Sequence, residues 1–119
     1  HEELVQKIYQ ENPVFHPTIM VRRSFYETSG GYDERLRRAQ DCDLWLRSYR
    51  RFRFQNLRCP LVRFRVKRKP SWDSVLYGSY VVARAAYREK GILRGTPYPL
   101  RFFTAGLLTK LGVIWTRPR

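Results

Sequence analysis

The sequence has few cysteines, few acidic residues and no long apolar run, and each shortage excludes a class of protein. Its two cysteines, Cys42 and Cys59, stand in neither a CxxC pair nor a Cys/His cluster, so we expect free thiols in a reducing compartment, without a disulfide framework. The longest apolar stretch, 102–115, has 14 residues and is too short to span a bilayer. No signal peptide, internal repeat or low-complexity tract is found.

Acidic residues are scarce and unevenly placed. The 119 residues include 24 Lys/Arg against 10 Asp/Glu, for a net charge of +14. Residues 1–34 carry a net charge of −3, whereas residues 35–119 carry +17. Such a basic block attracts phosphate groups on nucleotides, nucleic acid or anionic lipid, and charge alone does not distinguish them. This length allows one domain, and because the chain begins with His1 rather than Met, we expect a fragment or a processed piece.

Apolar periodicity predicts helices that alternate with short strands. The expected helices cover residues 1–11, 24–29, 40–52 and 71–90, and the expected strands cover 18–22 and two segments within 53–66. Ser24 and Glu27 form a capping-box pattern, and Gly30 and Gly91 follow helical patterns as C-terminal glycines. Trp45 falls on an apolar stripe and is predicted to be a core anchor.

The helix expected over 71–90 is the longest. Apolar residues recur along it at spacings of three and four, at Trp72, Leu76, Tyr80, Ala83 and Tyr87. We expect this stripe to face the core and cover a sheet.

The stretch 30–47, GGYDERLRRAQDCDLWLR, combines a glycine turn with a helix that starts on acidic residues. Paired glycines allow a sharp turn, because only glycine takes positive φ without steric strain. Asp41 and Asp43 would then lie in the first helical turn, where unpaired N–H groups and the macrodipole favour ionised carboxylates. Such a carboxylate either caps the helix or serves as a base, and both interpretations stay open. His16 is interpreted as a structural histidine, because no second ligand stands at a metal-binding spacing.

GGYDE followed by QDCDLWLR resembles the acceptor-side signature of family 2 glycosyltransferases of the GT-A fold. In that family the aspartate of the pair that corresponds to Gln40-Asp41 is the catalytic base. The resemblance covers about residues 12–70. It implies an α/β fold, the C-terminal part of a GT-A (Rossmann-like) domain with a short mixed sheet flanked by helices and a C-terminal amphipathic helix. Residues 1–92 would be the acceptor-side half and 93–119 a basic, apolar extension.

The implied reaction is inverting transfer of a sugar from a nucleotide sugar, such as a UDP-sugar, to a hydroxyl of a saccharide or lipid-linked acceptor, in glycan, polysaccharide or glycolipid biosynthesis. The resemblance places the catalytic base at Asp41, acceptor-binding residues at Gly30, Gly31, Asp33 and Gln40, and diphosphate-binding cations at Arg65, Lys67 and Arg68. Many members carry a metal-contacting histidine where Lys67 stands. A protonated lysine cannot bind a metal, so an ionic role is expected.

The family uses a divalent metal, Mg or Mn, held by an Asp-x-Asp motif in an N-terminal nucleotide-binding half. That half is missing from this chain, and Asp41-Cys42-Asp43 lies inside the base motif, so we assign it no metal. No QxxRW motif follows the base, which favours single sugar additions over polymerisation. We expect a cytoplasmic location, with peripheral attachment to the inner face of a membrane as a further expectation.

Two other functions stay open. A small basic nucleic-acid-binding domain would use the aromatic residues for base stacking, but many of them fall on apolar stripes and no nucleic-acid-binding motif is found. A peripheral membrane adaptor would insert the apolar side of 102–115 into an anionic membrane surface, with Arg101, Lys110, Arg117 and Arg119 at the headgroups. The same segment could instead be a terminal helix that packs on the domain or on the missing half.

Overall fold

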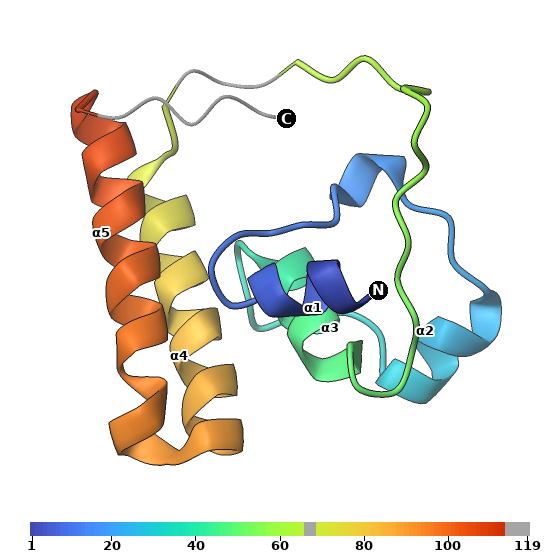
Figure 1. Cartoon of the computed structure of the whole chain (residues 1–119), viewed down its shortest axis with the longest axis horizontal. Coiled ribbons are helices and arrows are strands. Elements are labelled where there is room, and N and C mark those ends of the chain that lie inside the picture. The colour runs from blue at the N-terminus through green and yellow to red at the C-terminus, as the bar shows by residue number, and fades with distance from the viewer. Residues whose placement is uncertain (66–68, 114–119) are drawn as a thin grey trace.

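The computed structural model describes residues 1–65 and 69–113, and every regular element in them is helical (Figure 1). The elements are α1 (Glu2–Lys7), the 3₁₀ helix η1 (His16–Thr18), α2 (Arg23–Ser29), α3 (Gln40–Ser48), α4 (Trp72–Gly95) and α5 (Pro97–Leu111). No strand occurs in the described ranges. The predicted α/β fold with a mixed sheet is therefore wrong.

The two predicted strand regions fail for a shared physical reason. A strand needs a neighbour to bond its backbone N–H and C=O groups, and alternating side chains do not supply one. Residues 53–65 instead form an irregular link between α3 and α4 (Figure 1). Phe54 packs against the core, whereas Leu57, Leu61, Val62 and Phe64 stay exposed. Residues 18–22 include the end of η1 and the start of the extended approach to α2. Val66 lies outside the described residues.

Helices α4 and α5 lie side by side and run in opposite directions as a hairpin (Figure 1). Glycines let the two backbones approach closely: a Cβ at Gly78 would lie 2.5 Å from the ring of Phe102, and one at Gly106 would lie 3.0 Å from Val75. Gly91, with φ of +71°, interrupts α4 where the sequence predicts its end. Helix α5 thus packs on α4. This is the alternative to membrane insertion that the sequence left open for the C-terminal segment.

The core forms where α3 meets α4. Leu44, Trp45 and Leu46 of α3 are at most 1% exposed, as are Val81 and Val82 of α4. The prediction that Trp45 anchors the core is confirmed. None of the described helices is both long enough and apolar enough to cross a membrane.

The stripe predicted for the long helix is wrong. Four of its five members are exposed, namely Trp72, Leu76, Tyr80 and Tyr87. Helix α4 buries a different face, built from small and β-branched residues: Val75, Gly78, Val81, Val82, Ala85 and Ala86. Small side chains let α3 and α5 approach this face, whereas the large aromatic stripe has no sheet to cover.

Helix α2 starts differently from the predicted capping box. Its N-cap is Arg22, with no side-chain cap bond, and Glu27 pairs with Arg23 at 3.1 Å instead of reaching back to the helix start. Gly30 ends the helix in the left-handed conformation, as predicted.

A carboxylate on α4 ties the first and third helices together. The hydroxyls of Tyr9 and Tyr49 both donate to Glu89 Oε2, at 2.7 and 2.6 Å. Arg50 completes the group at 3.1 Å from the same oxygen. Burial and the bond to Glu89 raise the pKa of Tyr9 far above its usual range, so its hydroxyl remains a donor.

Candidate functional site

The site is built on the loop that leads into α3. Gly30 and Gly31 have φ of +75° and +64°, so the chain reverses after α2 at residues that tolerate this conformation. Ala39, the N-cap of α3, also has positive φ, at +61°. A non-glycine residue is uncommon there, and the turn at Ala39 sets the direction in which α3 begins.

Asp41 lies in the first turn of α3 with its side chain half-buried. Its Oδ2 accepts a hydrogen bond of 2.8 Å from the Asn12 side-chain amide, and no cation pairs with it in the described part of the chain. Helix α3 has no side-chain cap bond, so the interpretation of Asp41 as a cap is wrong. Its carboxylate is held by a neutral donor and retains acceptor capacity.

Tyr32 lies near Asp41 and bonds two further polar residues, Tyr26 and His16. The Tyr32 hydroxyl lies 3.0 Å from the Tyr26 hydroxyl and 2.8 Å from His16 Nε2. Burial, the bond to Tyr26 and then the nearby charge of Asp41 raise the pKa of Tyr32, so it stays protonated. We call these residues and Asn12 the Asp41 cluster.

Sequence reasoning found Asp41 in this cluster but missed its partners. Asn12 and His16 lie in the segment NPVFHP, and Tyr32 lies inside GGYDE. Both segments were singled out for the resemblance, which is the signal that could have found them. The predicted structural role of His16 fits its bond to Tyr32.

Asp43 faces away from Asp41 into a buried ionic network. Its carboxylate lies 2.7 Å from Arg47 and 3.2 Å from Arg84, and only 3% of the residue is exposed. Arg47 also donates to the carbonyls of Ser29 and Gly31. Asp43 therefore fastens α3 to α4 and, through Arg47, to the glycine turn.

Replacing Asp43 by Ala is expected to lower the free energy of unfolding by about 2 kcal/mol, because two guanidinium groups lose their shared acceptor. The loss stays below that for a fully buried pair, since Arg47 and Arg84 retain some solvent contact. Urea denaturation measures it. Replacing the exposed Asp73, which has no ion-pair partner in the described ranges, should change stability by less than 0.5 kcal/mol. Equal effects would contradict the network.

Asp33, predicted to border the acceptor, belongs to the same network. It lies 2.9 Å from Arg35 and 3.1 Å from Arg84. Hydrogen bonds from Arg35 and then Arg84 hold the pKa of Asp33 well below its usual range.

This depressed pKa predicts a pH dependence of stability. The usual pKa of 3.8 applies to the unfolded chain, so the contribution of Asp33 is complete above about pH 4 and is lost as the pH falls toward the lower folded value. Urea midpoints at pH 5 and pH 2.5 should therefore differ less in Asp33→Asn than in the wild type. Asp73→Asn serves as the control and should retain the wild-type difference. Identical pH profiles for all three proteins would contradict the role of Asp33.

The remaining predicted acceptor residues have structural contacts. The Gly31 carbonyl accepts from Arg47 at 2.6 Å, and the Gln40 side-chain amide donates to the Leu36 carbonyl at 2.6 Å. Gly30 and Gly31 shape the turn before α3, and Gln40 is adjacent to Asp41 at its start. The structure brings these residues to the same end of α3 as Asp41.

The predicted diphosphate cations are not described as a group. Arg65 is exposed on the link between α3 and α4. Lys67 and Arg68 lie outside the described residues.

The described residues do not fit a resident metal ion. Residues 1–65 and 69–113 contain no group of three His, Cys, Asp or Glu side chains that could hold one. Asp41 and Asp43 bond different partners, Asn12 and the arginines, and do not form a paired metal site. Cys42 is buried, and burial raises the pKa of its thiol to about 12, which makes thiolate ligation unfavourable.

Comparison with family models, with curated proteins and with solved structures finds no match to this chain. The glycosyltransferase resemblance therefore rests on the motif residues alone.

Proposed function

We propose that this chain carries the acceptor side of an inverting glycosyltransferase, with Asp41 as the catalytic base. The observation that supports it is the contrast between two neighbouring carboxylates. Asp43 is buried between Arg47 and Arg84, whereas Asp41 is half-exposed and bonded only to the neutral amide of Asn12 among the described residues. Of these two carboxylates, Asp41 is the one that can meet a substrate.

In the proposed reaction an acceptor hydroxyl donates a hydrogen bond to Asp41. Its oxygen attacks the anomeric carbon of the donor sugar while the proton passes to the carboxylate. The bond from that carbon to the diphosphate breaks at the same time, and the electron pair leaves with the nucleoside diphosphate. Attack from the opposite side inverts the anomeric carbon. Asn12 holds Oδ2 of Asp41, which leaves Oδ1 to face the hydroxyl.

The leaving group develops negative charge, which nearby cations stabilise. The resemblance implies this role for Arg65, Lys67 and Arg68. The net charge of +17 on residues 35–119 supports it. The donor itself requires a nucleotide-binding half. Exposed apolar side chains on the link and on α4, such as Leu61, Phe64 and Leu76, provide surface for that half to cover.

A transfer assay tests the proposal. The complete natural polypeptide that contains these residues is incubated with a panel of UDP-sugars and saccharide acceptors, and release of UDP is measured with and without acceptor. Acceptor-dependent release supports the proposal. No release with any pair, together with oligonucleotide binding that weakens steeply with salt, would favour the nucleic-acid-binding alternative.

The membrane alternative has its own test. Flotation with anionic vesicles compares the intact chain with a chain lacking residues 101–119. Helix α5 packs on α4, so the intact chain is expected to float no better than the truncated one. Flotation that depends on 101–119, without sugar transfer, would favour a membrane adaptor.

A further inference from the structure

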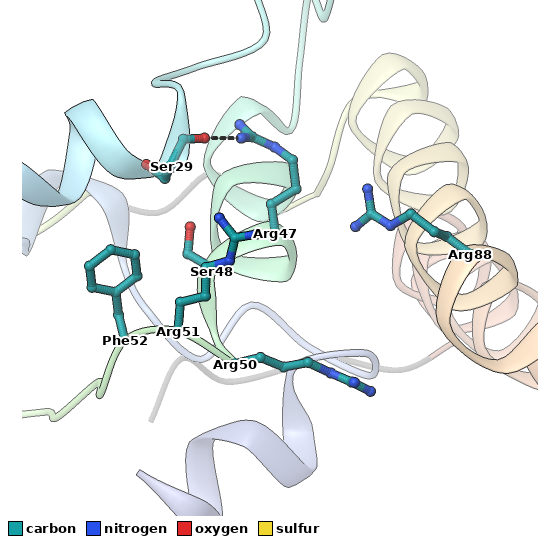
Figure 2. A pocket seen from close by; sticks show the side chains of 7 residues that line it. All are labelled: Ser29, Arg47, Ser48, Arg50, Arg51, Phe52 and Arg88. Carbon is teal, nitrogen blue, oxygen red and sulfur yellow. Dashed lines mark hydrogen bonds between the residues drawn. The ribbon is translucent and has the colours of Figure 1, made fainter.

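A pocket of about 420 Å³ lies at the C-terminal end of α3 (Figure 2). None of its lining residues belongs to the Asp41 cluster. Its lining residues come from the end of α2, the end of α3 with the turn after it, and α4: Ser29, Arg47, Ser48, Arg50, Arg51, Phe52 and Arg88. Ser48 follows Asp41 by seven residues, or about 10 Å along a helix. We call it the arginine pocket.

The arginine pocket concentrates positive charge. Four of its seven lining residues are arginines and none is acidic. Figure 2 shows Arg88 on α4 facing α3 across the pocket. Like charges gathered around a concave site raise the local concentration of anions.

Two of these arginines are available to a ligand. Arg47 is engaged by Asp43 and by two carbonyls, and Arg50 by Glu89. Arg51 and Arg88 are exposed, and their guanidinium groups have no hydrogen-bond or ion-pair partner in the described part of the chain. Guanidinium groups bind phosphate in a bidentate geometry.

A buried hydroxyl gives an independent indication. Ser48 is 1% exposed and lines the pocket, yet its Oγ has no hydrogen-bond partner among residues 1–65 and 69–113. An unpaired buried hydroxyl is unfavourable, because it has lost its hydrogen bonds to water without a replacement. A phosphate oxygen in the pocket would accept its hydrogen bond once the side chains that shield Oγ from solvent move aside.

We propose that the arginine pocket binds a phosphate group through Arg51, Arg88 and the Ser48 hydroxyl. Its volume lies within the range of small-molecule sites. The phosphate belongs to a soluble compound or to a lipid headgroup, which present the same chemistry. This site is separate from the proposed transfer site, so either can fail without the other.

Calorimetric titration with inorganic pyrophosphate at 150 mM salt tests the site. We compare the wild type with Arg51→Gln/Arg88→Gln and with the control Arg37→Gln/Arg38→Gln, which removes the same charge from two exposed loop arginines. We expect one saturable site that weakens at least tenfold in the first variant and less than twofold in the control. Equal weakening in both variants would overturn the proposal, because general attraction to net charge would then explain binding.

Two measurements test whether weaker binding comes from the site itself or from a folding defect in the variant. Amide chemical shifts of the wild type under pyrophosphate titration should change most at residues 48–52 and at Arg88; changes spread evenly over the basic surface would overturn the site. Ser48→Ala should weaken binding several-fold without lowering the melting temperature, since the hydroxyl has no partner to lose among the described residues. Unchanged affinity would overturn the role of this hydroxyl.

A vesicle arm distinguishes the two sources of phosphate. Vesicles with 20% phosphatidic acid in phosphatidylcholine are titrated with the same variants. Loss confined to Arg51→Gln/Arg88→Gln in the pyrophosphate arm identifies a soluble ligand, and loss confined to that variant in the vesicle arm identifies a headgroup. Loss in neither arm overturns the proposal.

Discussion

Replacing Asp41 by Asn is expected to lower the rate of the proposed sugar transfer by about 10²- to 10⁴-fold, the usual contribution of a general base. The amide keeps the shape of the side chain but cannot accept the proton of the acceptor hydroxyl. Its oxygen can still accept the hydrogen bond that Asn12 now donates to Oδ2. We therefore expect kcat to fall while the KM for the donor changes little, measured as acceptor-dependent UDP release by the complete polypeptide.

Asp73→Asn is the matched control, because Asp73 also lies in the first turn of a helix, α4, but away from the Asp41 cluster. Its activity should stay within twofold of the wild type. The melting temperatures of both variants should match the wild type, which separates lost chemistry from lost folding. Equal activity of the two variants would refute Asp41 as the base.

Replacing Trp45 by Ala is expected to destabilise the fold by about 3–5 kcal/mol, a large part of the stability of a domain this size. Trp45 is 1% exposed and lies in the core that joins α3 to the N-terminal segments. Its ring packs 6.1 Å from Phe25 and 5.9 Å from Phe54, measured between centroids. Removing the indole ring would leave a cavity between elements that are far apart in sequence. Guanidinium unfolding followed by circular dichroism measures the loss.

Trp72→Ala provides the comparison, since Trp72 on α4 is 49% exposed. This replacement should lower the free energy of unfolding by less than about 1 kcal/mol. Trp45→Phe should cost less than Trp45→Ala, because it keeps an aromatic ring and removes an indole N–H that has no partner among the described residues. Equal losses in Trp45→Ala and Trp72→Ala would contradict the core assignment.

Local signals located the start of α3 and the end of α2 at Gly30. Each depends on residues within four positions of one another, so the sequence carries all the information needed. The contact of Asp41 with Asn12 joins residues 29 positions apart. No periodicity reports a contact at that separation.

The sequence by itself therefore determined where helices form, where glycines turn the chain and how strongly positive the chain is. Backbone propensity and charge are local properties, so no distant contact is needed to set them. The tertiary structure decided which face of α4 is buried and that the segment 53–65 has no strand partner. It also decided which acid of the Asp-Cys-Asp triplet is locked in ion pairs. These outcomes depend on which distant surfaces meet, since burial and hydrogen bonding are satisfied between elements and not within them.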